Sequence, residues 1–158
     1  MELIILIGLQ ASGKSSWYRQ QFADTHQLVS KDLMSRNVRK AVQQHQLVDE
    51  ALLAGRSLVV DNTNPTIEDR ASLIALGKQY GAEIIGYYFE PDVRASLIRN
   101  RGRSGLERVP DVAVYTAAKK LTRPTFSEGF ERLYTIRIAE EGKFTALPFS
   151  EEERVDGS

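Results

Sequence analysis

Residues 8–15 read Gly-Leu-Gln-Ala-Ser-Gly-Lys-Ser and fit the pattern G-x-x-x-x-G-K-[ST]. The glycines let such a loop wrap so that successive backbone N–H groups face a polyphosphate, and a helix after it presents its positive end to the same phosphates. The Lys14 ammonium can reach the β- and γ-phosphate oxygens, and the Ser15 hydroxyl can ligate Mg²⁺. We therefore expect a phosphate-binding loop (P-loop) that holds a nucleotide through Gly8, Gln10, Ala11, Ser12, Gly13, Lys14, Ser15 and Ser16.

Two aspartates directly follow short apolar runs and carry carboxylates suited to phosphoryl transfer. Asp61 follows Ser57–Val60, where a carboxylate can hold Mg²⁺ through water, but it equally suits the cap of a strand-to-loop turn. Asp32 follows Leu28–Val29 and can accept the proton of an acceptor hydroxyl, or cap a helix that starts at Leu33. The residues alone leave both alternatives open for each aspartate.

Four arginines lie within ten residues, interrupted by two glycines: Arg99, Arg101, Arg103 and Arg108. A mobile, cationic segment can close over a nucleotide, and its arginines can stabilise charge on a phosphoryl group during transfer. A solvated surface loop has the same composition. We expect an arginine-rich lid, with the solvated loop as its alternative.

Short apolar runs alternate with segments of helical composition, and this order predicts where the polar side chains meet. Strands are expected at residues 3–8, 28–29, 57–60, 84–89 and 133–138, and helices at 14–22, 33–54, 66–80, 110–121 and from 92 onward. In the helix at 66–80 we expect a buried face formed by Ile67, Ala71, Ile74, Ala75 and Lys78. The alternation predicts an α/β fold of the P-loop NTPase type, a parallel sheet with helices on both faces, in which ligands bind at the carboxyl ends of the strands.

The composition excludes several classes of protein. A chain of 158 residues with 42% hydrophobic residues suits one compact domain. The absence of cysteine excludes disulfides, thiol catalysis and cysteine-bound zinc. No apolar run approaches the roughly 20 residues of a membrane span, and no signal peptide is evident, so we expect a cytoplasmic protein that does not bind membranes.

The net charge is zero, from 21 Lys+Arg and 21 Asp+Glu, which excludes a basic coat for duplex binding. This zero is an average: residues 139–158 carry a net charge of −4, which leaves +4 on residues 1–138. We predict a P-loop kinase domain at 1–138 and a loosely held acidic tail at 139–158, in which Phe144, Leu147 and Phe149 can tuck onto the domain. A local basic patch suffices for a protein that grips only the end of a strand.

The motifs so far do not fix the substrate. The chain has no Asn-Lys-x-Asp guanine motif, which argues against a GTPase. A small-molecule kinase acting on a sugar, a nucleoside or an antibiotic would share the P-loop, the base and the lid. A non-catalytic ATP-binding module is a further alternative, although such a module has no use for a base or a lid.

Six segments occur in one order along the chain: 8–17, Val-Ser-Lys-Asp at 29–32, Val-Asp-Asn-Thr-Asn-Pro at 60–65, Arg-Asn-Arg-Gly-Arg at 99–103, Val-Pro at 109–110, and Pro-Thr-Phe-Ser-Glu-Gly-Phe at 124–130. Together they resemble the P-loop polynucleotide 5′-hydroxyl kinases, such as the phage enzyme and the kinase half of the animal polynucleotide kinase/phosphatase. The resemblance covers residues 3–138, and the strings at 61–65 and 124–130 are its specific parts.

The resemblance implies transfer of the ATP γ-phosphate, with Mg²⁺, to the 5′-OH end of DNA or RNA. It implies that Asp32 is the general base, that Lys14 and Ser15 bind phosphate and metal, and that Arg103 and Arg99 are the lid arginines. Ser15 and Asp61 are the expected metal residues, and for Asp61 the turn cap stays open as the alternative.

Three departures from the family pattern qualify this expectation. Ser35 stands where some members have an arginine that contacts the acceptor phosphate, so Arg36 or Arg39 is expected to take that contact. Gln10-Ala11 replaces the usual Pro-Gly, which a loop tolerates only where its backbone angles do not need glycine. The chain has no Asp-x-Asp-x-[TV] motif, so we expect no phosphatase activity of that type, and a ligase or phosphatase partner stays open, as does the oligomeric state.

Overall fold

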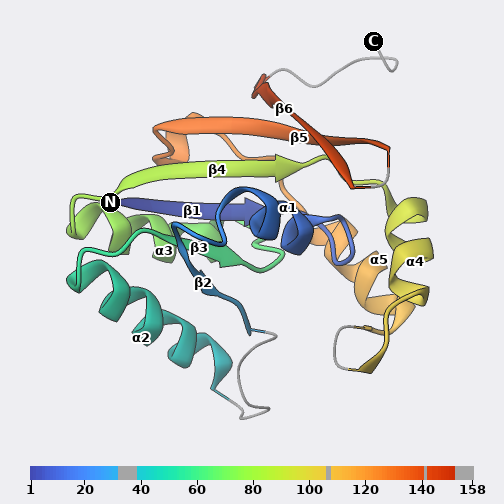
Figure 1. Ribbon diagram of the computed structural model, residues 1–158, viewed down its shortest axis with the longest axis horizontal. Coiled ribbons are helices and arrows are strands. Elements are labelled where there is room, and N and C mark those ends of the chain that lie inside the picture. Colours follow the sequence, from blue (N-terminus) through green and yellow to red (C-terminus); the bar gives the residue numbers. More distant parts are fainter. Residues whose placement is uncertain (32–38, 106–107, 141, 152–158) are drawn as a thin grey trace.

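The computed structural model describes residues 1–31, 39–105, 108–140 and 142–151 (Figure 1). Six strands form one sheet in the order β2-β3-β1-β4-β5-β6. The strands are β1 (Glu2–Ile7), β2 (Gln27–Val29), β3 (Leu58–Asp61), β4 (Glu83–Phe89), β5 (Arg132–Glu140) and β6 (Lys143–Pro148). The first five are parallel, and each lies within two residues of its predicted position.

Five helices connect the strands: α1 (Lys14–Gln21), α2 (Lys40–Leu53), α3 (Ile67–Gln79), α4 (Val93–Arg101) and α5 (Asp111–Lys120), followed by the short 3₁₀ helix η3 (Phe126–Glu128). The Thr66 hydroxyl caps α3 and the Asp92 carboxylate caps α4, each accepting a backbone N–H three residues on, as their sequences favour. Only the later part of the helix expected at 33–54 can be compared, because residues 32–38 lie outside the described part of the chain.

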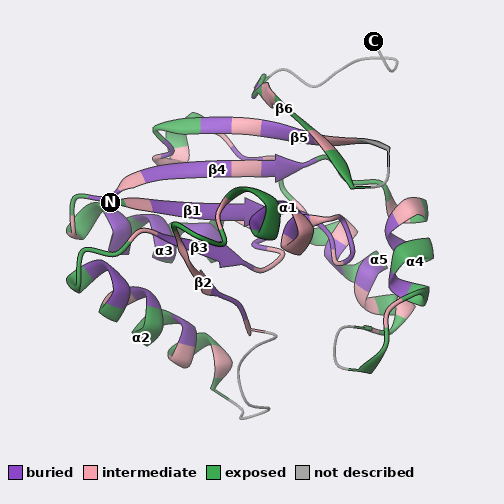
Figure 2. Ribbon diagram, viewed as in Figure 1, coloured by how far each residue is buried: buried purple, intermediate pink, exposed green. Residues whose placement is uncertain are grey.

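The sheet is covered by helices on both faces, which confirms the predicted α/β architecture. Successive side chains of β1 point to opposite faces, and both faces are fully buried (Figure 2). Leu3 and Ile5 pack with residues of α2 and α3, whereas Ile4 packs with Trp17 and Tyr18 of α1. The P-loop helix therefore lies alone on one face, and α2 and α3 share the other.

The buried face of α3 differs from the predicted one. Ile67 is 45% exposed, and among the expected face residues only Ile74 is buried. The side chains that face the sheet are instead Arg70, Leu73, Ile74, Leu76 and Gly77. The expectation was wrong because it treated Arg70 as a solvent-facing position, whereas this arginine is fully buried.

The sheet extends beyond the domain boundary predicted at residue 138. β5 continues to Glu140, and β6 pairs with it antiparallel at the sheet edge. Residues 143–148 of the expected tail form this strand, and Phe144 and Phe149 pack onto the domain, as expected for the apolar residues of the tail. Phe144 of β6 packs against Trp17, with the two ring centroids 5.6 Å apart, so this strand also supports the P-loop helix.

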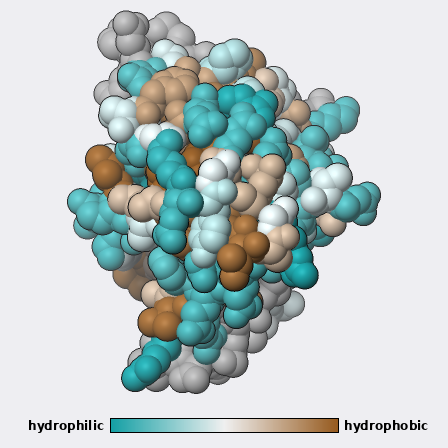
Figure 3. Space-filling model, turned by 90° about the vertical axis from the view of Figure 1, so that its left-hand side faces the viewer, coloured by the Kyte–Doolittle hydropathy of each residue, from teal (hydrophilic) through white to brown (hydrophobic). Residues whose placement is uncertain are grey.

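The two ends of the parallel strands have different surroundings. At the carboxyl end, the P-loop, α4 and α5 lie beyond the strands (Figure 1). At the amino end, hydrophilic side chains cover most of the surface, with only scattered apolar ones (Figure 3). Within the described ranges, no helix has both the length and the apolar character needed to cross a membrane.

Candidate active site

A cavity of about 890 Å³ opens at the carboxyl ends of the strands, where α/β folds bind ligands. The P-loop forms one wall, and the residues that follow β2 and β3 form the floor. Side chains from α2, α3, α4 and α5 complete the lining. The cavity therefore joins a phosphate-binding half to a second half that is lined by α2, α3 and α5.

The P-loop backbone uses the left-handed region at two positions. Gly13 has φ 95°, and a side chain there would come within 2.9 Å of Phe144, so only glycine fits. Ala11 has φ 57°, a conformation that favours glycine. Alanine thus occupies a position of the loop whose backbone angles favour glycine. Gln10-Ala11 was expected to be tolerated only where these angles do not need glycine, and that condition is not met. The loop therefore carries local backbone strain at Ala11.

Lys14 folds back over the P-loop. Its side chain is largely buried, and the ammonium donates to the Gly8 carbonyl at 3.0 Å, to the Leu9 carbonyl and to the Ser12 hydroxyl at 3.4 Å. All three oxygens belong to the P-loop itself. The ammonium is thus held on the axis of the loop, where it can exchange carbonyl oxygens for phosphate oxygens.

Ser15 and Asp61 meet at the start of α1. The Ser15 hydroxyl donates to the Asp61 carboxylate at 2.7 Å, and Asp61 is 6% exposed. Both side chains also line the cavity. Hydroxyl and carboxylate oxygens are hard ligands that suit Mg²⁺, and this ion commonly takes only one or two protein ligands beside phosphates and waters. The donor set therefore fits a magnesium ion.

The loop after β3 ties the P-loop to the end of β2, a role that the sequence analysis missed. The Gly8 N–H donates to the Thr63 carbonyl at 3.1 Å, and the buried Asn64 amide donates to the Leu6 carbonyl at 2.8 Å. Asn62 accepts the Lys31 backbone N–H at 2.9 Å and donates to the Gln44 side chain. The specific string at 61–65 therefore acts through backbone contacts as well as through Asp61.

Two of the four clustered arginines face the cavity. Arg99 and Arg103 line it, and the Arg99 guanidinium donates to the Ala11 carbonyl at 3.4 Å. Arg101 instead pairs with Asp111 at 3.2 Å on the exposed surface. Spacing along α4 explains the division, since Arg99 and Arg101 point to different sides of one helix.

Asn100, which the sequence analysis did not single out, closes the arginine segment. Its fully buried side-chain amide donates to the Val109 carbonyl at 2.6 Å, and its oxygen accepts the Val109 N–H at 3.0 Å. These two bonds fix both ends of the segment between α4 and α5. A polar residue between two arginines gave no signal that it would be buried.

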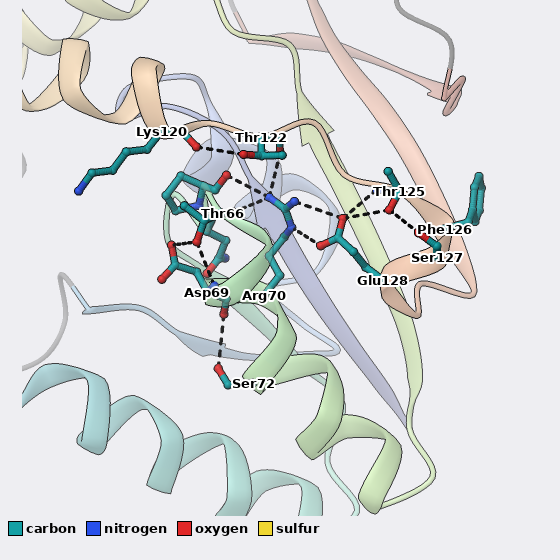
Figure 4. Close-up of polar contacts among 12 residues, drawn as sticks. Thr66, Asp69, Arg70, Ser72, Lys120, Thr122, Thr125, Phe126, Ser127 and Glu128 are labelled. Atoms are coloured by element: carbon teal, nitrogen blue, oxygen red, sulfur yellow. Dashed lines mark hydrogen bonds and ion pairs between the residues drawn. The ribbon is translucent and has the colours of Figure 1, made fainter.

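Arg70 joins the two specific strings of the sequence (Figure 4). Its guanidinium pairs with Glu128 at 2.8 Å and 3.2 Å, and donates to the carbonyls of Asn64, Pro65 and Thr122. Glu128 also accepts the Thr125 backbone N–H at 2.8 Å, which completes a capping box. The string at 124–130 therefore has a structural role, because Glu128 holds Arg70, which in turn binds the carbonyls of the loop at 61–65.

The charges around the cavity favour anions. Its lining includes more cationic side chains, among them Lys31 and Lys120, than carboxylates, which are Asp61, Glu68 and Asp69. Burial, with a smaller contribution from the Asp24 carboxylate, raises the pKa of the Tyr18 phenol, which also lines the cavity. This hydroxyl stays protonated and donates to the His26 carbonyl at 2.8 Å.

Of the predicted acceptor-side residues, the structure describes only Arg39. Asp32 and Arg36 lie outside the described residues, and so does Ser35. Arg39 is exposed, stands at the N-cap position of α2 without a side-chain cap, and is not among the residues that line the cavity. Lys31, which directly precedes Asp32, does line it.

Comparisons with known proteins agree with this geometry. Residues 3–124 match the sequence model of a family described as an AAA domain. A bifunctional polynucleotide phosphatase/kinase of Schizosaccharomyces pombe is 27% identical over 136 residues, covering 82% of this chain and 32% of that protein. The chain spans only 32–33% of the length of the curated relatives that it matches.

Solved structures share the fold at low sequence identity. A fungal RNA kinase superposes with a TM-score of 0.67 at 15% identity, covering 88% of this chain and 76% of that one. A gluconokinase from Sinorhizobium meliloti 1021 gives 0.64 at 19% identity, covering 88% and 83%. The chain therefore belongs to the AAA domain family, with the fold and the nucleotide-binding loop of a P-loop kinase.

Proposed function

We propose that this chain is an ATP-dependent polynucleotide 5′-hydroxyl kinase, which transfers the γ-phosphate of ATP to the 5′-OH end of DNA or RNA. The observation that carries the proposal is the continuity of one cavity from the P-loop, across the Ser15–Asp61 pair, to Lys31 at the end of β2. The match to a bifunctional polynucleotide phosphatase/kinase over most of this chain supports the choice of acceptor.

The donor half provides positive charge around the transferred phosphoryl group. Lys14 binds the β- and γ-phosphates, and Arg103 and Arg99 offset charge on the γ-phosphate from the opposite side. Ser15 and Asp61 would hold Mg²⁺, which would supply charge neutralisation for the phosphates. Their placement in one cavity supports these roles.

A smaller cavity of about 310 Å³ beside the P-loop suits the nucleoside of ATP. Ser12, Pro91 and Arg137 are among its lining residues, and Arg99 lines both cavities. Arg99 therefore stands on the wall between the two cavities, where its guanidinium can contact the phosphates.

The acceptor half positions the attacking hydroxyl. Asp32 accepts the proton of the 5′-OH as the oxygen attacks the γ-phosphorus, and ADP leaves on the opposite side. The backbone hydrogen bond from Lys31 to Asn62 supports this role, because it fixes the residue before Asp32 beside the loop that carries Asp61. We propose Arg36 and Arg39 as the cations that contact the acceptor.

A small-molecule kinase is the second candidate. The gluconokinase has nearly the same fold similarity, and a cavity with Glu68 and Asp69 on its wall also offers hydrogen bonds to sugar hydroxyls. Incubation with labelled ATP and either a 5′-OH oligonucleotide or a panel of sugars and nucleosides separates the two candidates. Labelled oligonucleotide supports our proposal, and labelled metabolite alone refutes it.

The role of the base is tested by Asp32→Ala, with Asp24→Ala as an exposed control. We expect Asp32→Ala to abolish transfer to the oligonucleotide while the Kd for ATP changes little, and Asp24→Ala to leave both unchanged. Transfer by Asp32→Ala at the wild-type rate would remove Asp32 from the mechanism.

A further inference from the structure

Both glycines of the P-loop lie against apolar side chains that come from the sheet. A Cβ atom on Gly8 would be 2.9 Å from the Phe89 Cβ, and a Cβ atom on Gly13 would be 2.9 Å from the Phe144 ring. Ile138 of β5 approaches the same point on Gly13 to 3.1 Å. The two ends of the loop therefore rest directly on side chains of β4, β5 and β6.

The two phenylalanine rings also contact each other and the single tryptophan, which lies on α1. The Phe89 and Phe144 ring centroids are 6.5 Å apart at an angle of 81°. The Trp17 ring centroid is 6.5 Å from that of Phe89 and 5.6 Å from that of Phe144, again edge to face. Aromatic rings favour this arrangement because the positive edge of one meets the negative face of the other. The P-loop and the start of α1 thus stand on one packed group of three rings.

Phe144 reaches this group from a part of the chain that the family match does not include, since that match covers residues 3–124. Antiparallel pairing places Phe144 of β6 opposite Ile138 of β5. The Gln20 side chain, near the end of α1, donates to the Gly142 carbonyl at the turn between the two strands, at 3.1 Å. The hairpin of β5 and β6 is therefore attached to α1 at its turn and to the P-loop through Phe144.

Gly13 is the point at which a contact from outside has the most effect on the loop. It stands at the N-cap of α1 with φ 95° and without a side-chain cap, and its carbonyl accepts the Trp17 backbone N–H at 2.9 Å. Its backbone angles thus determine how the loop amides and the first turn of α1 face a phosphate. Glycine populates many backbone angles freely, so contacts with neighbouring side chains must select one of them.

We propose that Phe144 is a positioning residue for nucleotide binding, whose ring holds Gly13 in its left-handed conformation so that the P-loop is ordered before the phosphates arrive. The inference rests on the nucleotide-binding part of the proposed function and extends its machinery to β6, outside the segment shared with the family model. Phe144 is not among the residues that line the two cavities, so it acts through the loop rather than on the ligand.

The test compares Phe144→Ala with Leu147→Ala, a matched control on the same strand. Leu147 is half-buried, as Phe144 is, and it points to the opposite face of the sheet because the two residues are three positions apart on a strand. Calorimetry measures the Kd for ATP with Mg²⁺, without acceptor, at a temperature at which both variants are folded. Phe144→Ala should raise this Kd about 10-fold, which corresponds to ordering roughly one backbone residue on binding. Leu147→Ala should leave it unchanged.

Hydrogen–deuterium exchange of the peptide that spans residues 8–16 is a readout that depends neither on binding nor on turnover. Without nucleotide, this peptide should exchange faster in Phe144→Ala than in the wild type, and at the wild-type rate in Leu147→Ala. If Phe144→Ala does not fold, Phe144→Leu retains much of the apolar volume without the ring. It should raise the Kd for ATP about 3-fold and also accelerate exchange of the peptide.

The outcomes separate this inference from the proposed function. An unchanged Kd for ATP in a folded Phe144→Ala or Phe144→Leu variant would overturn the role of Phe144. An equal rise in Kd for Leu147→Ala would also overturn it, because weaker binding would then follow from loss of hairpin stability and not from loss of the ring. A wild type that binds ATP but transfers phosphate to no 5′-OH oligonucleotide would overturn the proposed function alone, since these measurements use no acceptor.

Discussion

Replacing Arg70 by methionine should cost far more stability than the same change at a surface ion pair. Arg70 and Glu128 have side-chain exposures of 0% and 6%, against 58% and 43% for Arg101 and Asp111. Methionine keeps much of the apolar volume but removes five hydrogen bonds, two of them to Glu128. The Glu128 carboxylate then stays buried, and among the backbone groups of this cluster only the Thr125 N–H still donates to it.

Breaking one side of a buried pair typically costs about 3–5 kcal/mol, because the remaining charge stays desolvated and uncompensated. The free energy of unfolding of a domain is about 5–15 kcal/mol, so Arg70→Met should remove roughly a fifth of it or more. Arg101→Met should cost at most about 1 kcal/mol, since exposed pairs contribute little.

Urea unfolding followed by Trp17 fluorescence measures this difference, because Trp17 is the single tryptophan and is 6% exposed. If Arg70→Met does not fold, Glu128→Gln provides the same test, with an expected loss of about 1.5–3 kcal/mol from the charged hydrogen bonds. The double variant should lose less than the sum of the single ones, because the uncompensated charge is gone. Equal losses for Arg70→Met and Arg101→Met, or strict additivity in the double variant, would refute the structural role of the pair.

Three further predictions concern the site itself. Ala11→Gly should raise the free energy of unfolding by about 1 kcal/mol by relieving the left-handed φ of 57°; a lower midpoint in thermal unfolding would contradict the strain. Asp61→Asn should lower kcat by about 100-fold or more and raise the Mg²⁺ concentration needed for half-maximal rate, and a variant with wild-type magnesium dependence would exclude Asp61 from the metal site. Asn100→Leu should cost about 1–3 kcal/mol of stability by leaving the Val109 N–H and carbonyl unpaired, and should also lower kcat with little change in the KM for ATP; unchanged kcat would mean that these bonds do not position Arg103.

The parallel strands and the P-loop were predictable because they depend on local patterns. Short apolar runs such as that of β1 are buried on both sheet faces, and the glycine-lysine-serine spacing is tied to one backbone geometry. The meeting of Ser15 with Asp61 followed from a general rule, that the carboxyl ends of parallel strands share one edge of the sheet.

The supporting contacts were not predictable in the same way. Arg70, Asn100 and Asn64 are polar residues whose partners lie in segments distant in sequence or on backbone atoms, and composition places such side chains at the surface. β6 was missed for a related reason. It is an edge strand whose residues are exposed or half-buried, and its pairing with β5 determines its conformation.

The central claim is that one cavity joins ATP to the 5′ end of a nucleic acid strand. The most direct test mixes the wild-type chain with γ-labelled ATP, Mg²⁺ and equal amounts of a 5′-OH oligonucleotide and of the same oligonucleotide already phosphorylated at its 5′ end. Our account predicts label on the 5′-OH strand alone, at a position removed by phosphatase. An unlabelled 5′-OH strand, under conditions in which the chain labels a sugar or a free nucleoside, would contradict it.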